Sequence, residues 1–239
     1  METVIVMMSD PTSGPEEALG EALHVDVVKE DETMATRYLD LAMTESVRRA
    51  QKHYYGHAAR IADAPERDPL GEAEIEFIAA RDSFYLGTVS ETGWPYIQHR
   101  GGHRGFLRVV NGTTLAFADY KGNRQLLTTG NISVNDRVAL FLMDYKNRER
   151  LKIFGHARVE DARAHPELVA RLADSTMRSA AERLVFIEIV SFDWNCSKYI
   201  TPRYSAEEVE GYAGSLKMRI IELEEALSAT KAGSEPSRK

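Results

Sequence analysis

The chain has 239 residues, of which 43% are hydrophobic, and its formal net charge is −7; this is enough apolar material for one large domain or two small ones. The acidic balance disfavours sequence-independent binding to nucleic acid, because no surplus of cations is available to displace phosphate counterions. One cysteine cannot build a disulfide framework, and no signal peptide or long apolar run is present, so we expect a cytoplasmic protein without a membrane span.

The first third of the chain is predicted to be an irregular arm followed by helices. Residues 1–32 combine proline, glycine, serine and acidic residues with little periodicity, which predicts an irregular arm. Apolar residues then recur at helical spacing over 33–62 and again over 70–80. We therefore expect a helical lead-in, residues 33–80, that packs on the next domain.

Residues 81–204 are predicted to form a β-rich domain, because the apolar period changes at Ser83 from helical to alternating. The Asn111-Gly112 pair is a strong hairpin signal, and the apolar run 138–143 is typical of a strand buried on both faces. The expected strands are 84–90, 94–100, 106–110, 113–118, 138–143, 151–159 and 184–192, with one helix over 166–174. Short turns and few helices favour a closed or partly closed antiparallel barrel over a βαβ sheet.

The remaining residues, 205–239, are predicted to form a helix over 206–229 and a frayed end. One face of that helix is apolar, and it carries Val209, Leu216, Ile220, Leu223 and Leu227. Such a stripe packs either on its own domain or on a partner subunit.

Two segments combine hydrogen-bonding side chains with glycine. Gln98, His99 and Arg100 end a strand and are followed by Gly101, which lets a flat ligand approach the backbone closely; the alternative is a hairpin end with a surface arginine. In residues 119–131, Asn123 is expected to cap a helix that Gly130 ends. The free backbone amides at the start of that helix could bind a phosphate together with the side chains of Lys121 and Arg124, although most helix starts bind no ligand.

Two further segments are weaker candidates. Arg150 and Lys152 project to one face of a strand, either into a site or onto a solvated barrel face. Trp194 and Asn195 follow a strand, where the indole either borders a planar ligand or anchors the strand in the core. We interpret Cys196 as a small buried side chain rather than a nucleophile, because the sequence places no clear catalytic base beside it.

Together these segments, above all 98–102 and 120–124, resemble the pyridoxamine 5'-phosphate oxidase-related family of flavin-nucleotide-binding proteins. The resemblance implies an α+β fold dominated by β structure, a Greek-key split β-barrel that forms a homodimer with FMN in each of two interface clefts. It implies that Arg100, Lys121, Asn123 and Arg124 hold the phosphate end. Gln98, His99 and Arg150 would flank the ring, and Trp194 with Asn195 would come from the other subunit. The expected cofactor site is Gln98, His99, Arg100, Gly101, Tyr120, Lys121, Asn123, Arg124, Arg150, Lys152, Trp194 and Asn195.

The leading functional hypothesis is an FMN-dependent oxidoreductase that acts on a small molecule, with NADH or NADPH as a candidate electron donor. The flavin carries the hydride, so no separate catalytic residue is assigned, and Arg150 or Lys152 beside the ring would favour its reduction. Vitamin B6 oxidation is disfavoured, because the chain ends in a helix where pyridoxamine phosphate oxidases have a basic, histidine-containing strand. Residues 197–199 also depart from the Pro-Gln-His of similar proteins.

Three alternatives compete with this hypothesis. A flavin-binding module without turnover would use the same residues. Haem binding would use His99, His103 or His156. His53 and His57 lie four residues apart on a predicted helix, but without an acidic or cysteine companion a solvated helix is the better interpretation than a metal site.

Overall fold

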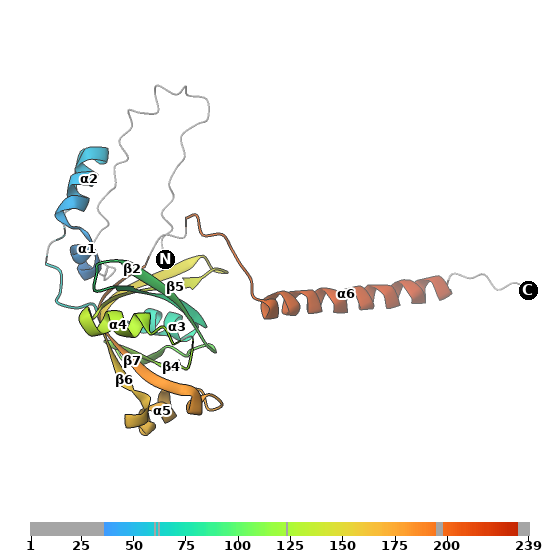
Figure 1. Cartoon of the computed structure of the whole chain (residues 1–239). Helices are drawn as coiled ribbons and strands as arrows, with labels where there is room; N and C mark the ends of the chain where they lie inside the picture. The colour runs from blue at the N-terminus through green and yellow to red at the C-terminus, as the bar shows by residue number, and fades with distance from the viewer. Residues whose placement is uncertain (1–35, 60, 62, 123, 195–197, 234–239) are drawn as a thin grey trace, which may run out of the picture. The chain divides into compact units, whose positions relative to one another are not determined.

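A computed structural model describes residues 36–233 except 60, 62, 123 and 195–197, with side chains to Ser228 (Figure 1). The predicted N-terminal arm lies outside the described residues, and so do Asn123, Asn195 and Cys196.

Three helices, α1 (Thr36–Ala42), α2 (Glu45–Tyr55) and α3 (Glu72–Ala79), precede the first strand, as predicted. The Thr44 hydroxyl accepts a hydrogen bond from the amide of Val47 at the start of α2, and Gly56 ends that helix with a left-handed φ of 77°. His57 lies beyond this end, where its Nδ1 is 2.8 Å from the carbonyl oxygen of Tyr55. His53 and His57 therefore do not share a helical face.

Seven antiparallel strands form one sheet in the order β2-β1-β5-β6-β7-β4-β3. In Figure 1 they curve around a common interior, and because β2 and β3 are the two end strands the barrel is split rather than closed. This confirms the predicted fold. The strands are β1 (Ser83–Val89), β2 (Pro95–Gly101), β3 (Arg108–Asn111), β4 (Thr114–Tyr120), β5 (Arg137–Asp144), β6 (Glu149–Asp161) and β7 (Ala181–Trp194).

The other helices lie between or after the strands. α4 (Leu127–Val134) contacts β1 and β6, and α5 (Pro166–Leu172) follows β6. α6 (Ala206–Gly233) is the long C-terminal helix that the apolar stripe predicts; Ser205 and Glu208 cap it reciprocally, each side chain accepting the other's amide. No described helix is both long and apolar enough to cross a membrane.

The core fills the inner face of the sheet. Phe84 stacks on Phe106 and meets Phe117 edge to face, while Leu140 and Ile153 are almost completely buried. The prediction that residues 138–143 are buried on both faces was wrong. β5 alternates as antiparallel strands do. Of its outer side chains, Ala139 is exposed and Phe141 and Met143 are half-buried within one chain, although all three are apolar.

An ion pair joins the end of α3 to the end of β5. The guanidinium of Arg81 lies 2.8 Å from the carboxylate of Asp144, with side-chain exposures of 14% and 11%, and it also lies over the ring of Phe77. Burial alone would raise the pKa of Asp144, but hydrogen bonds from the Asn147 amide and from Arg81 lower it below its usual value.

Gly155 lies at a bulge in β6, where the register with β7 shifts. A Cβ at this position would lie 2.6 Å from the carbonyl oxygen of Glu188 and 2.8 Å from Cγ2 of Ile187. We expect Gly155→Ala to lower the free energy of unfolding in urea by about 2 kcal/mol, because two packed strands must move apart. Gly130→Ala is the matched control. It lies inside α4 with open space around it, so it should raise stability by about 1 kcal/mol; an equal loss for both variants would contradict the packing argument.

Candidate functional site

A cavity of about 190 Å³ lies where β2, β4, β7 and α4 meet. Four residues of the site expected from the sequence line it: Gln98, Arg100, Tyr120 and Arg124. The structure thus brings together both segments that the sequence singled out, although they are separated by a complete hairpin. Other residues that line it, above all Asp119, Thr128 and Arg183, were not predicted.

Asp119 holds two arginines at this cavity. Its Oδ1 accepts a hydrogen bond from Nη1 of Arg100 at 2.6 Å, and its Oδ2 accepts one from Nε of Arg183 at 2.8 Å. All three side chains are less than 20% exposed. The Nε of Arg100 is buried and has no hydrogen-bond partner among the described residues. Arg124 also lines the cavity, and Arg183 pairs with Glu182 as well as with Asp119. Three arginines therefore meet two carboxylates here, and this surplus of positive charge favours an anionic ligand.

Arg183 lies directly opposite Asp119 across β4 and β7. Opposite charges facing each other in this way stabilise a strand pair. Arg183 could be recognised as a site residue only from the register that pairs β4 with β7. The sequence pattern does not give this register, because the two residues lie more than 60 positions apart in the chain.

Gln98 and Tyr120 are fixed by neighbours. The hydroxyl of Thr128, on α4, donates to Oε1 of Gln98 at 2.8 Å, and the hydroxyl of Tyr120 accepts a hydrogen bond from the amide of Asp174 at 3.1 Å. These contacts position polar side chains at the cavity wall before any ligand binds.

The loop between β4 and α4 differs from the prediction. The helix begins at Leu127, four residues after Asn123, and Gly130 lies inside it rather than at its end. Before the helix, Arg124 and Leu126 adopt the left-handed conformation, with φ angles of 62° and 54°. Because neither residue is a glycine, this conformation costs about 1 kcal/mol for each. Nothing in the residue types marks these positions, so capping rules placed the helix start too early. Lys121 is exposed, and its amide donates to the carbonyl of Ala180.

Three of the expected residues lie on the other face of the sheet. Side chains directly opposite each other on neighbouring strands share a face, and the register places His99 of β2 in one row with Tyr85 of β1 and Lys152 of β6. This row is the outer face, whereas Gln98 and Arg100 point inward beside Leu86 and Phe84. Within one chain, His99, Arg150 and Lys152 therefore do not reach the cavity.

These outer-face residues have contacts of their own. Lys152 pairs with Asp193 at 2.6 Å and lies over the ring of Tyr38, as expected for a charged residue on a barrel face. The Nε of Arg150, in contrast, is buried without a hydrogen-bond partner in the described part of the chain. Gly101, which ends β2, is exposed and lies close to the ring of His99.

Trp194 anchors the end of β7. Its indole nitrogen donates to the carboxylate of Glu74 at 2.6 Å, and its ring meets Phe77 edge to face. The indole therefore serves as a strand anchor within one chain, although 39% of the residue remains exposed.

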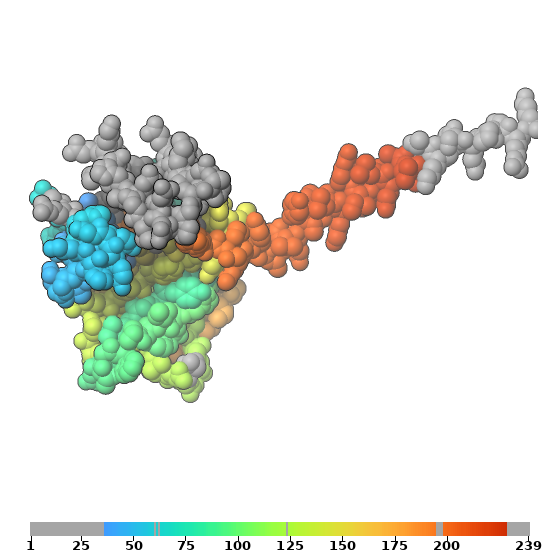
Figure 2. All heavy atoms as spheres, turned by 90° about the horizontal axis from the view of Figure 1, so that it is seen from above, coloured from blue at the N-terminus to red at the C-terminus, as the bar shows by residue number. Residues whose placement is uncertain are grey.

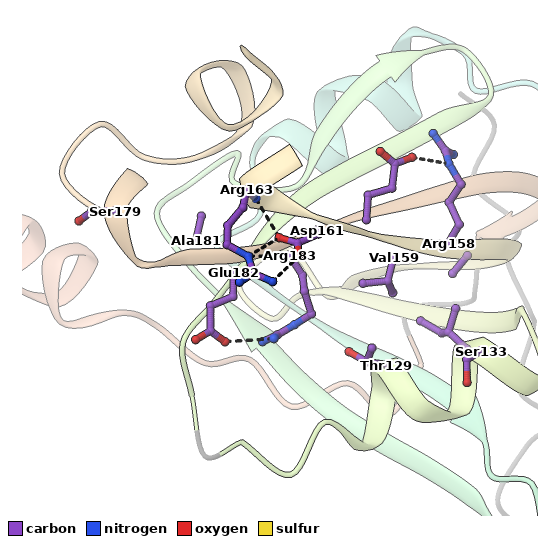
Figure 3. Close-up of a pocket in the computed structure, with 13 residues that line it drawn as sticks. Thr129, Ser133, Arg158, Val159, Asp161, Arg163, Ser179, Ala181, Glu182 and Arg183 are labelled. Carbon is purple, nitrogen blue, oxygen red and sulfur yellow. Dashed lines mark hydrogen bonds and ion pairs between the residues drawn. The ribbon is translucent and has the colours of Figure 1, made fainter. Parts of the chain in front are cut away.

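A second cavity of about 790 Å³ adjoins the first, and Thr129 and Arg183 line both (Figure 3). Its arginines are paired with carboxylates: Arg163 with Asp161 at 2.6 Å, Arg158 with Glu160 at 2.9 Å and Arg183 with Glu182 at 3.0 Å. Arg163 lowers the pKa of Asp161 to about 2, chiefly by hydrogen bonding to the carboxylate. Because its charges are balanced, this cavity suits an anion less well than the smaller one does.

The histidines considered for haem do not gather at one site. His99 packs edge-on against Tyr85, His103 faces Asp174 at 3.5 Å and His156 faces Asp136 at 3.0 Å. Over the described residues, no three His, Cys, Asp or Glu side chains are grouped to hold a metal ion.

Comparisons with solved structures give distant similarities. A Lactobacillus delbrueckii protein named as a pyridoxamine 5'-phosphate oxidase is 19% identical, with a TM-score of 0.41 over 52% of this chain and 93% of its own. An FMN-binding protein from Syntrophomonas wolfei is 13% identical, with a TM-score of 0.40 over 51% and 83%. HupZ of Group A Streptococcus is 12% identical, with a TM-score of 0.40 over 52% and 92%. No curated protein matches the chain.

The family itself is identified from the sequence. The profile of the pyridoxamine 5'-phosphate oxidase family matches residues 70–191, which is more than half of the chain and runs from the start of α3 through most of β7. This range includes the cavity and all of the residues that hold its arginines in place. The chain belongs to the pyridoxamine 5'-phosphate oxidase family.

Proposed function

We propose that the chain binds FMN with its phosphate in the small cavity and acts as an oxidoreductase on a small molecule other than vitamin B6. The observation that carries this proposal is the arrangement of Arg100 and Arg183 on one carboxylate beside Arg124. A phosphate dianion suits the guanidinium groups of Arg100 and Arg183, which are largely buried and held in place by Asp119. Arg124 is exposed and adds a further positive charge to the cavity lining.

The size of the cavity bears on where the ring would lie. At about 190 Å³ it is smaller than the roughly 300–1,000 Å³ of sites that enclose a drug-sized ligand. It suits a phosphate and part of the ribityl chain, so the ring extends beyond it and needs another surface. We propose that a second copy of the chain supplies that surface. His99 and Arg150, which point away from their own chain's cavity, would then reach a flavin held by the partner.

FMN, when bound, supplies the hydride chemistry, and the protein's residues bind and orient it. Arg100 and Arg124 hold the phosphate, and Gln98 is held at the cavity wall by Thr128. Arg150 is suited to place positive charge beside the ring, where a cation favours flavin reduction, because its Nε is buried and lacks a hydrogen-bond partner among the described residues. Lys152 is less suited, because Asp193 already neutralises it.

The test is a titration of the purified, full-length protein with FMN, followed by flavin fluorescence and the visible spectrum. We expect saturable binding of one FMN per chain in a dimer of defined mass. A protein that shows no affinity for FMN would refute the proposal.

Turnover is tested separately, by adding NADH or NADPH to the FMN complex without oxygen and following the loss of flavin absorbance. Reduction supports an oxidoreductase. Binding with no reduction, and with no oxidase activity on small amines or alcohols, would instead identify a flavin-binding module.

A further inference from the structure

Seven apolar residues of α6 follow a seven-residue repeat, whereas Tyr212, Met218 and Ile221 lie outside it. Going along the helix, the seven are separated by alternating steps of three and four residues, which is the pattern of a coiled coil. The series is Ala206, Val209, Ala213, Leu216, Ile220, Leu223 and Leu227. With Ala206 assigned to position a, the series fills every a and d position from Ala206 to Leu227.

This seam is uncovered in the single chain. The five large side chains, Val209, Leu216, Ile220, Leu223 and Leu227, are 49–55% exposed. Figure 2 shows α6 in orange. α6 also contains Gly211 and Gly214, each of which destabilises a helix relative to alanine. Isolated helices are marginal in water even with better sequences, so the length of α6 indicates a partner along the seam.

We propose that this partner is α6 of a second copy, in a parallel, in-register, two-stranded coiled coil. The centre of the seam favours two strands, because Ile220 occupies an a position while Leu216 and Leu223 occupy d positions. This proposal is independent of flavin binding, and it rests on none of the residues of the cavity.

The flanking charges select the parallel arrangement. Arg219 occupies a g position and Glu224 the e position of the next heptad, so a parallel pair brings each Arg219 beside the partner's Glu224. In a centred antiparallel pair, Arg219 and Lys217 would instead each face their own copies, and Glu210 would face the partner's Glu224. An antiparallel pair shifted by one heptad in one direction brings Lys217 beside the partner's Glu224 but leaves Val209 without a partner. The shift in the other direction brings Glu210 beside the partner's Lys217 but leaves Leu227 without a partner.

Disulfide cross-linking of the full-length protein tests the arrangement. In a Cys196→Ser background, which removes the one natural cysteine, Leu227→Cys should form a disulfide-linked dimer in a glutathione redox buffer. Met218→Cys is the control, because it lies on the helix but off the seam. Equal cross-linking of both variants, or none for Leu227→Cys, would overturn the proposal. So would preferential cross-linking of Leu227→Cys to Leu216→Cys in a mixture, which only the first of the two shifted antiparallel pairs allows.

A charge reversal in the Leu227→Cys background tests the register. Arg219→Glu should lower the ratio of disulfide to free thiol at equilibrium by about tenfold, because it places like charges beside each other. Adding Glu224→Arg should restore the ratio to within about threefold, since opposite charges face each other again. Failure of the second change to restore the ratio would contradict the parallel register. A shift in FMN affinity is not expected for either variant.

Discussion

Arg100→Ala and Arg124→Ala are each expected to weaken FMN binding by about 10- to 100-fold, as measured by fluorescence titration. A hydrogen bond to a charged group is worth about 1.5–3 kcal/mol, and both guanidinium groups face the cavity that we assign to the phosphate. Added salt screens an exposed charge more than a buried one. The loss of FMN affinity in Arg124→Ala should therefore shrink with salt, because Arg124 is exposed, and the loss in Arg100→Ala should shrink less, because the Arg100 side chain is only 14% exposed.

Riboflavin, which lacks the phosphate, is the sharpest control for these variants. It should bind the wild-type protein more weakly than FMN does, and its affinity should not change in either variant. Arg49→Ala provides a matched control on the protein side, because Arg49 lies on α2 with 68% of its side chain exposed. Equal losses for FMN and riboflavin would show that the arginines hold the fold of the cavity rather than the phosphate.

Arg81→Met is expected to lower the free energy of unfolding by about 3 kcal/mol, because it leaves the carboxylate of Asp144 buried without its cation. The double variant Arg81→Met, Asp144→Leu should recover most of this loss, since a buried ion pair replaced by apolar side chains is often neutral. Urea denaturation measures both. A double variant as unstable as the single one would show that Arg81 acts through its hydrogen bonds to the carbonyls of Phe77 and Met143 and its contact with the Phe77 ring, rather than through the ion pair.

The same pair predicts how stability depends on pH. The pKa of Asp144 is lower in the folded chain than the ordinary value of about 3.9. Its contribution is therefore fully present above that ordinary value and is lost as the pH falls toward the lower, folded value. Asp144→Asn should flatten the fall in unfolding free energy below about pH 4. An unchanged slope would assign acid unfolding to other carboxylates.

Most strands and helices could be predicted from the sequence, because their periodicities are strong. The hairpin of β1 and β2 is marked by alternation and by a glycine turn, and the start of β1 by a change of apolar period at Ser83. The start of α4 could not be predicted, because Arg124 and Leu126 adopt a conformation that their side chains disfavour. Such strained positions carry no mark in the residue type.

The candidate site was predicted in part, for a reason that follows from strand geometry. Alternation shows that Arg150 and Lys152 share a face, but it does not show which face is buried. That depends on which strands pair, and pairing places both residues on the outer face. Arg183 was missed for the same reason, since only the pairing of β4 with β7 brings it to Asp119.

The placement of β2 at the end of the sheet has a consequence for how this protein tolerates changes in chain length. β2 is bonded to β1 alone, and its side chains point alternately to the two faces. One residue inserted between Pro95 and Gln98 would turn Gln98 and Arg100 outward and His99 inward. Two residues inserted there would return these side chains to their original faces of the sheet. A one-residue insertion would thus remove the proposed cofactor site with every one of its residues still present in the chain.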